Sequence, residues 1–438
     1  MTSTQLMEQI CSSTNLNQAL RRVKKNKGCA GVDKLDIAAT ISVLRQSSNG
    51  QALRQSLLDG SYQPQPVLGV EIPKPSGGVR QLGIPTVLGL GICPKQAITS
   101  VLTDIYEPKF SNSSYGFRPN RSAHHALAAA SHYIREGRGY VVDVDLAKYF
   151  DTVNHDRLMH RLSKDITDKR VLKLIRSYLQ AGIMRNGLVE QRQRGTPQGG
   201  PLSPLLSNIV LDELDKELER RGHKFCRYAD DCQIYVHSEE AANRVKASIT
   251  EFLEQKLKLT VNREKSAATR VTERTYLGHR FQRDGSIHIS KTAQTHMKKR
   301  VRQITKRNRG RELKTVIVEL TQYLRGWQHY FKLAMRKSAM QRLDEWIRRR
   351  LRCYRLKQRK RRHSIATWLR QEGVNERNAW KLAMSEKGWW HLALSPQLNQ
   401  AMPTKRFKEM GMYSLRDGYE SLKIYSEPPY ATHACTVV

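Results

Sequence analysis

Apolar and polar positions along the first 290 residues follow two periods, and each period predicts its own kind of element. Up to about Leu58 the apolar residues recur at helical spacing, interrupted at residues 26–31 by a loop that contains two glycines. Between Tyr62 and Pro85 two short β-rich pieces flank the turn Lys-Pro-Ser-Gly-Gly at 74–78. This arrangement predicts a hairpin with a basic tip.

Helix and strand signals alternate in the middle of the chain. Residues 203–221 form the clearest helix, because Ser203 can cap it, Pro204 suits its first turn and Gly222 can end it. The stretch RYADDCQIYV at 227–236 predicts a second hairpin. The other predicted elements are helices at 94–106 and 123–135, a strand at 139–146 and a helix that begins at Glu239. This order favours an α+β domain with helices on one face of an antiparallel sheet.

The C-terminal part differs in pattern and in charge. After about Ile289 strand signals vanish and basic helices follow, so we expect a domain boundary there and a weaker one near Lys387. The chain has 76 Lys and Arg against 40 Asp and Glu, a formal charge of +36, and residues 291–390 hold 29 basic and 7 acidic residues. Pairing along a helix cannot neutralise that excess, so a solvated helical face explains it less well than contact with nucleic acid.

The cysteines and the N-terminal residues argue against a secreted or membrane-spanning protein. The seven cysteines are scattered, odd in number and never spaced as C-x-x-C, which indicates neither a disulfide framework nor a zinc knuckle and fits a reducing compartment. No basic segment followed by an apolar run opens the chain, and no stretch of about 18 apolar residues occurs. We therefore expect a protein that is neither secreted nor membrane-spanning.

Four aspartates in β-rich segments are the candidates for chemistry. Asp143 and Asp145 lie two residues apart in VVDVDL and face one side of a strand, whereas Asp230 and Asp231 face opposite sides unless the chain turns between them. Carboxylates in a sheet are costly unless a cation or hydrogen bonds compensate, and Mg²⁺ prefers carboxylates together with substrate phosphates. Two Mg²⁺ ions about 4 Å apart would serve phosphoryl transfer. The alternative is that these aspartates are exposed turn formers at hairpin ends.

Eight segments, in this order, resemble motifs of the group II intron-encoded reverse transcriptase and maturase family, and the resemblance spans roughly residues 14–410. They are IPKPSGGVRQLGIPT (72–86), SYGFRPNRSAHHAL (114–127), VDVDLAKYFDTVNHD (142–156), RGTPQGGPLSPLLSNIVLDELD (194–215), YADD (228–231), LTVNREKS (259–266), YLGH (276–279) and RGWQHYF (325–331). The YADD segment alone would be a weak signal, but the set in register is highly specific.

The resemblance implies a right-hand polymerase and assigns roles to single residues. It implies that Asp145 and Asp230, with Asp231 alongside, bind two Mg²⁺ ions, and that Lys265 acts as a general acid near the leaving pyrophosphate. Asp143 falls outside the family's metal positions and is expected to be a neighbour. The residues implied to contact the incoming deoxynucleotide are Lys74, Arg80, Phe150 and Gln198, of which Phe150 would exclude a ribose 2′-OH. Taken without the family, the same residues are explained by exposed turns, core packing and a helix-start loop.

The resemblance also implies three domains and a surface for nucleic acid. Fingers and palm would occupy 1–289, a helical thumb called domain X 290–386, and a short basic tail resembling a DNA-binding region 387–438. The run 348–362 is expected to be a helix along intron RNA or the template-primer duplex. The expected nucleic-acid contacts are Arg118, Arg121, Trp327, Arg348, Arg349, Arg350, Arg352, Arg355, Lys360, Arg361 and Arg362.

The function implied by the resemblance is RNA-directed DNA polymerisation combined with intron maturation. The protein would bind group II intron RNA, assist its splicing and copy it from a DNA target primer during retrohoming, using dNTPs and two Mg²⁺ ions. It would do so without a membrane, as a monomer or homodimer, in a bacterial cytoplasmic ribonucleoprotein associated with the nucleoid.

Two departures from the family pattern keep alternatives open. The Asp-Arg pair that usually follows LGIPT is replaced by the glycine-rich segment 87–97, so one alternative is a splicing maturase with impaired polymerase activity. The chain also carries no H-N-H endonuclease pattern, which resembles the endonuclease-free lineages. A domesticated reverse transcriptase in phage defence or repair is a further alternative, which the complete domain X disfavours.

Overall fold

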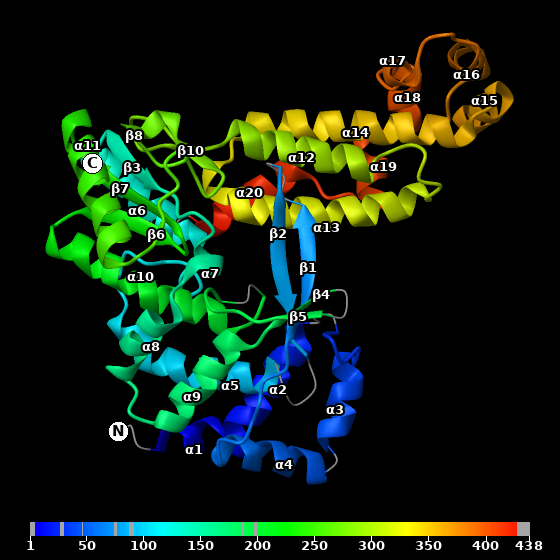
Figure 1. Ribbon diagram of the computed structural model, residues 1–438. Helices are drawn as coiled ribbons and strands as arrows, with labels where there is room; N and C mark the ends of the chain where they lie inside the picture. The colour runs from blue at the N-terminus through cyan, green and yellow to red at the C-terminus, as the bar shows by residue number, and fades with distance from the viewer. Residues whose placement is uncertain are drawn as a thin grey trace, which may run out of the picture. The chain divides into compact units, whose positions relative to one another are not determined.

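The computed structural model describes residues 5–26, 30–45, 47–73, 77–86, 92–185, 188–196 and 199–426. The chain divides into two compact units, Met1–Val271 and Thr272–Val438, and each is described by itself (Figure 1). The first unit is α+β and the second is mainly helical, as predicted from the change in pattern along the chain. Within the described ranges no helix is both long enough and apolar enough to cross a membrane.

The N-terminal unit contains two four-stranded sheets and most of its residues lie in helices or strands. Its helices are α1 (Leu6–Ile10), α2 (Ser13–Asn26), α3 (Ile37–Arg45), α4 (Ser47–Leu58), α5 (Ile92–Tyr106), α6 (Ala123–Arg135), α7 (Tyr149–Thr152), α8 (His155–Ser163), α9 (Lys169–Gln180), α10 (Leu202–Arg220) and α11 (Glu239–Glu251). Its strands are β1 (Val67–Pro73), β2 (Val79–Ile84), β3 (Tyr140–Val144), β4 (Ile183–Arg185), β5 (Leu188–Glu190), β6 (Lys224–Tyr228), β7 (Asp231–Val236) and β8 (Ala267–Arg270).

The first sheet has the strand order β2-β1-β4-β5, and its β1–β2 ribbon is the hairpin predicted between Tyr62 and Pro85 (Figure 1). The two strands pair antiparallel from Leu68 opposite Ile84 to Pro73 opposite Val79, whereas β1 and β4 run parallel. Gly77 and Gly78, with φ of 90° and 79°, supply the left-handed backbone that the turn requires. Lys74, at the predicted tip, lies outside the described residues.

The second sheet, of order β6-β7-β3-β8, is entirely antiparallel and carries the four candidate aspartates. Strand β3 alternates as predicted: Val142, Val144 and Leu146 belong to the buried core, which leaves Asp143 and Asp145 for the other face. Helix α11 contacts β3, β7 and β8, and helices α6 and α10 contact β6. The predicted antiparallel sheet packed with helices is therefore confirmed.

Helix α10 packs against β6 of this sheet, and its start differs from the prediction. The expectation that Ser203 caps the helix is wrong, because α10 begins at Leu202 and Ser203 is buried in its first turn. The predicted stop is confirmed: α10 ends at Arg220, and Gly222 adopts a φ of 73°.

The C-terminal unit combines one small sheet with helices. Its strands are β9 (Thr275–Tyr276), β10 (His279–Phe281) and β11 (Ile287–Ile289). Its helices are α12 (Lys291–Ile304), α13 (Leu313–Phe331), the 3₁₀ turn η5 (Lys332–Ala334), α14 (Lys337–Arg359), α15 (Arg362–Gln371), α16 (Glu376–Ala383), α17 (Trp389–Leu392), α18 (Pro396–Ala401), α19 (Thr404–Glu409) and α20 (Leu415–Ser426).

The small sheet belongs with the helices that follow it. Strand β11 contacts η5, Tyr330 Oη donates to the Leu277 carbonyl at 3.1 Å, and a Cβ on Gly278 would lie 3.4 Å from the Phe331 ring. Strand structure in the described chain thus stops at Ile289, whereas the compact units divide between Val271 and Thr272.

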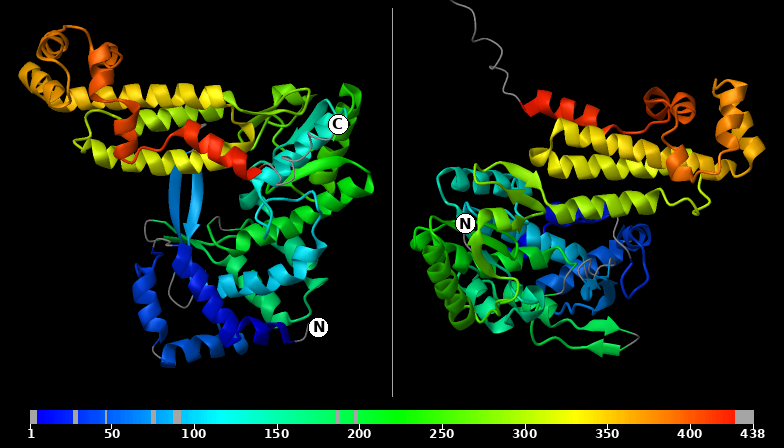
Figure 2. Two further views of the ribbon diagram at one scale, coloured as in Figure 1. Left: turned by 180° about the vertical axis from the view of Figure 1, so that it is seen from behind. Right: turned by 90° about the horizontal axis from the view of Figure 1, so that it is seen from above.

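Residues 388–426 fold back onto α13 and α14 (Figure 2). Leu398, Phe407 and Leu415 are buried in the same hydrophobic cluster as the long helices. Asp344 of α14 accepts hydrogen bonds from Ser414 Oγ, Leu415 N and Arg416 N, each at 3.0 Å, and so holds the start of α20. The predicted tail therefore shares one core with the predicted thumb as far as Leu415.

Candidate active site

The YADD segment forms the tight turn between β6 and β7. Tyr228 pairs with Asp231 across the hairpin, so Ala229 and Asp230 are the two turn residues. Ala229 has a φ of 58°, in the left-handed region that costs a residue with a side chain. Gly116 lies flush against this turn, because a Cβ there would be 2.3 Å from Ala229 N. The backbone at Gly116 therefore supports the turn from one side.

A fully buried arginine supports the same turn from within the protein. The Arg227 guanidinium donates to both carboxylate oxygens of Asp215, at 2.7 and 2.5 Å, and to Asn208 Oδ1 at 2.9 Å. It also donates to the Ala229 carbonyl at 2.9 Å and to Ser114 Oγ at 2.8 Å. Arg227 and Asp215 are both 0% exposed. The network ties α10, the SYGF segment and the YADD turn together.

We did not predict this network from the sequence. The sequence nevertheless contains a signal for it. An arginine in an apolar strand and an aspartate on the apolar face of α10 are each costly to bury alone, so a buried ion pair between them could have been predicted.

The second carboxylate, Asp145, lies just beyond the end of β3 and is held by the segment 259–266. Asp145 N donates to Ser266 Oγ at 3.0 Å, and Asn262 N donates to the Asp145 carbonyl at 2.8 Å. Lys265, from the same segment, places Nζ 4.0 Å from Asp145 Oδ2, and 67% of its side chain is exposed. The structure thus brings Lys265 close to Asp145.

The candidate aspartates lie close enough for their charges to raise the pKa of Asp231. Desolvation, followed by the charges of Asp230, Asp143 and Asp145, raises the pKa of Asp231 to about 7. The Asp231 side chain is exposed, so the charges of the neighbouring carboxylates contribute more to this rise in pKa than burial does. Asp143 receives a hydrogen bond from Gln233 Nε2 at 3.3 Å, which fits its expected place as a neighbour.

This donor set suits a hard divalent cation in the presence of substrate. The clustered donors are carboxylate oxygens, whose negative charges repel one another. A bound cation would neutralise these charges. Within the described ranges, no three His, Cys, Asp or Glu side chains are gathered closely enough to enclose an ion without other ligands. Two carboxylates completed by substrate phosphates is the arrangement that Mg²⁺ accepts.

The predicted nucleotide contacts are only partly described. Phe150, in α7, packs partly buried against the core, and its carbonyl accepts a hydrogen bond from Thr196 N at 2.6 Å. A Cβ on Gly199 would lie 2.7 Å from the Gly83 carbonyl, so the loop ending at Gly199 meets strand β2, which carries Arg80. Gln198 and the irregular segment 87–91 lie outside the described residues, as does the Arg80 side chain.

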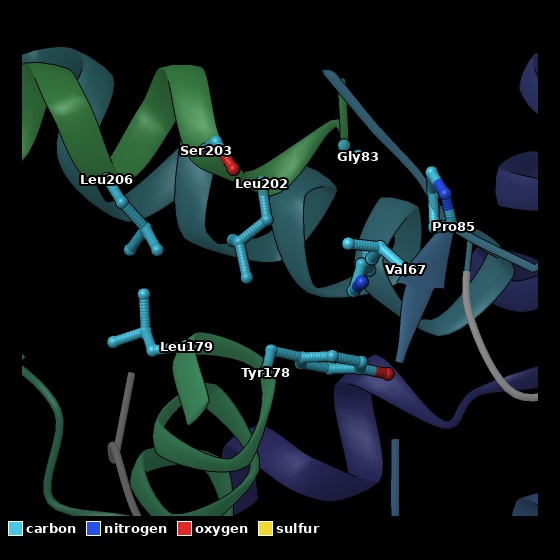
Figure 3. Close-up of a pocket in the computed structure, with 10 residues that line it drawn as sticks. Val67, Gly83, Pro85, Tyr178, Leu179, Leu202, Ser203 and Leu206 are labelled. Atoms are coloured by element: carbon cyan, nitrogen blue, oxygen red, sulfur yellow. The ribbon is translucent and has the colours of Figure 1, made fainter. Parts of the chain in front are cut away.

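A small cavity of about 20 Å³ lies between the β1–β2 ribbon, α5, α9 and the start of α10 (Figure 3). Lys95 lines it, is 4% exposed, and holds its ammonium 4.7 Å from the centroid of the Tyr178 ring. Burial lowers the pKa of Lys95 to about 8. We did not predict this buried lysine, since a lysine in a helix is normally a surface residue.

Three of the predicted nucleic-acid contacts are buried, which corrects their expected role. Arg118 is 8% exposed and donates to Glu107 and to the carbonyls of Ser111 and Ser114. Arg352 is 7% exposed, with two donors on the Met402 carbonyl, and Trp327 is 8% exposed within the core. These side chains therefore serve mainly to stabilise the fold, through hydrogen bonds or core packing.

The remaining predicted contacts leave more of their side chains accessible. Arg121 is partly exposed and donates to Asn112, while Arg349 stacks 3.9 Å above the Trp390 ring. The prediction of one helix over 348–362 is wrong, because Lys360 has a φ of 56° and separates α14 from α15. The other predicted contacts of this run are half-buried or exposed, and they are Arg348, Arg350, Arg355, Lys360, Arg361 and Arg362.

Sequence comparison matches two successive parts of the chain to two families. Residues 72–281 match the family described as reverse transcriptase (RNA-dependent DNA polymerase), and residues 294–372 match the group II intron maturase-specific domain.

Two related proteins cover much of the same region. Protein YkfC of Escherichia coli (strain K12) is 35% identical over 298 residues, covering 59% of this chain and 76% of YkfC. Group II intron-encoded protein LtrA of Lactococcus lactis subsp. cremoris is 31% identical over 324 residues, covering 57% of this chain and 54% of LtrA. The chain therefore spans about half the length of LtrA.

Among solved structures, a chain of a partial Cas6-RT-Cas1–Cas2 complex is 25% identical, with a TM-score of 0.36, over 57% of this chain and 43% of its own length. Candida tropicalis telomerase, truncated from the C-terminal domain, is 14% identical with a TM-score of 0.42, over 56% of this chain and 60% of its own length.

Proposed function

Because the chain belongs to the group II intron-encoded reverse transcriptase and maturase family, we propose that it copies RNA into DNA and assists the splicing of its own intron RNA. The observation that carries the polymerase part is the convergence of Asp145, Asp230, Asp231 and Lys265 at one end of the two inner strands, β3 and β7, of the β6-β7-β3-β8 sheet. The +36 charge carries the nucleic-acid part.

We propose for single residues the roles that the family resemblance implies. Asp145 and Asp230, supported by Asp231, would hold two Mg²⁺ ions, which when bound supply positive charge to the reacting phosphate and primer hydroxyl. Lys265 is exposed beside Asp145 and can give a proton to the leaving pyrophosphate oxygen. Phe150 would exclude a ribose 2′-OH, while Lys74, Arg80 and Gln198 would contact the deoxynucleotide triphosphate.

The wider role is retrohoming. We propose that the protein forms a ribonucleoprotein with its intron RNA in the bacterial cytoplasm, associated with the nucleoid, and extends a primer at a DNA target. The maturase domain would hold the intron through its Arg- and Lys-rich surface, because phosphate contacts supply affinity and the shape of the RNA supplies specificity.

Template-primer extension tests the polymerase. The wild type should extend a DNA primer on RNA with dNTPs and Mg²⁺, and Asp230→Ala should abolish extension. The matched control is Asp104→Ala, which removes an exposed aspartate of α5 and should extend like the wild type. A wild type that makes no cDNA, or an active Asp230→Ala, contradicts the proposal.

A second candidate function is a splicing maturase that no longer polymerises, favoured by the glycine-rich departure at 87–97. A splicing assay on the same preparations separates the two. Splicing without any extension by the wild type would select this second function.

A further inference from the structure

The C-terminal unit contains a cavity of about 480 Å³ that the polymerase chemistry does not use. It lies between β11, α12, the end of α13, η5 and the first half of α14, all within one unit. A cavity of this size is in the range that holds small organic groups. The side chains that decide its chemistry are Lys298, Arg302, Arg336, Arg342, Trp327 and Trp346. We call it the thumb cavity.

The charge of the thumb cavity is positive and uncompensated along its lining. Four of the lining side chains are Lys or Arg, and none is Asp or Glu. The fifth titratable group of the lining, His288, supplies no negative charge. Burial and the charge of Arg336 lower the pKa of His288, and its ring nitrogen lies 2.9 Å from Arg336 Nη2. An occupant that carries phosphate would neutralise this lining.

The aromatic lining offers a planar surface. Trp346 is half-buried, with the guanidinium of Arg302 5.7 Å and that of Arg350 5.6 Å from its ring centroid. Arg350 is fixed by a 2.6 Å hydrogen bond from Nε to Thr305 Oγ1. Tryptophan rings and guanidinium planes are the surfaces on which unpaired bases stack.

Trp327 also lines the thumb cavity, but it is 8% exposed and packs within the hydrophobic core of this unit. Trp346 is half-buried and is therefore the aromatic side chain that offers a surface to an incoming base.

We infer that the thumb cavity receives one unpaired nucleotide of an RNA strand. The base stacks at Trp346, while the adjoining phosphates lie on Lys298, Arg302, Arg336 and Arg342. RNA is the strand chosen because the cavity lies within residues 288–346, largely inside the 294–372 match to the maturase-specific domain. The inference rests on the proposed binding of intron RNA.

The test uses the full chain and two fluorescently labelled RNA hairpins, one with a single-nucleotide bulge and one with an abasic site at the bulge. The wild type should bind the intact bulge about 5- to 100-fold more tightly, the range expected for stacking of one base. Trp346→Ala should remove that preference and leave the affinity for the abasic hairpin unchanged. Trp346→Phe should retain part of the preference, which excludes simple misfolding.

The charged lining is tested by salt dependence. The double variant Lys298→Gln/Arg342→Gln should weaken binding of both hairpins and reduce the slope of log K against log salt by about 1.4 to 1.8, the value for two lost phosphate contacts. The control Arg377→Gln/Lys381→Gln removes the same charge from exposed positions of α16 and should keep the base preference.

Equal wild-type affinity for the two hairpins overturns the inference, as does a preference that survives in Trp346→Ala. Tighter binding of the same hairpins made of DNA overturns the choice of RNA. Asp230→Ala should keep the base preference, so a failed primer extension with the preference intact refutes only the polymerase, and active extension without the preference refutes only the thumb cavity.

Discussion

The buried pair Arg227–Asp215 is expected to hold the YADD turn in place, and Arg227→Met tests it. The substitution keeps an unbranched side chain but removes five hydrogen bonds, two of them to a carboxylate that is 0% exposed. Full burial already raises the pKa of Asp215, with Arg227 opposing, so the lone carboxyl would be left without its counter-charge. Breaking such a pair costs about 3 to 5 kcal/mol.

The assay combines urea unfolding with primer extension. Because a domain has only about 5 to 15 kcal/mol of stability, Arg227→Met should lower the unfolding midpoint of the N-terminal unit strongly. The double variant Arg227→Met/Asp215→Leu removes both charges, so most of the stability should return. Extension should stay low in both, since the Ala229 carbonyl and Asn208 have still lost their donor.

The reasoning is refuted by either of two results. An Arg227→Met protein within about 1 kcal/mol of the wild type would show that the pair contributes little net stability. Full extension by the stable double variant would show that the guanidinium does not position the turn. Arg220→Gln, which removes an exposed arginine of α10, is the matched control and should change neither measurement.

Three further predictions concern other groups. Burial lowers the pKa of Lys95 to about 8 from 10.5, so the folded state binds fewer protons between those values and stability rises with pH across them. Lys95→Met should therefore raise the unfolding free energy by about 3 kcal/mol at pH 7, with the gain shrinking towards pH 10 in urea titrations. Lys265→Ala should slow single-turnover nucleotide addition about 10²- to 10⁴-fold without moving the unfolding midpoint, because the side chain is exposed; normal rates would exclude it as the general acid. Asp344→Ala should cost about 1 to 2 kcal/mol and expose the chain after Gly411 to protease first, and unchanged digestion would show that the cap does not hold α20.

The local elements could be predicted because their signals are local. The YADD hairpin, the β1–β2 ribbon and α6 follow from alternation, turn residues and helical spacing within a few residues. The start of α10 at Leu202 was placed less well, because both a serine and a proline nearby could begin the helix and packing decided between them.

Most residues of the candidate site could also be named from the sequence, because the motifs are specific in residue type and in order. Asp145, Asp230, Asp231 and Lys265 were named from motifs, and the structure brings Lys265 within 4.0 Å of Asp145. The residues that support the site could not be predicted in this way. The role of Arg227 depends on its hydrogen bonds to Asp215, Asn208 and Ser114, which are distant from it in sequence.

The order of elements, the family and the identity of the candidate carboxylates can be read from the residues in order along the chain. Which basic side chains stay accessible to nucleic acid depends on how distant segments pack. Arg349 and Arg352 lie on the same helix, yet Arg349 stacks on Trp390 while Arg352 is buried against the Met402 carbonyl. Their burial differs because segments some 40 to 50 residues further along the chain fold back onto α14, and helical spacing alone does not encode that packing.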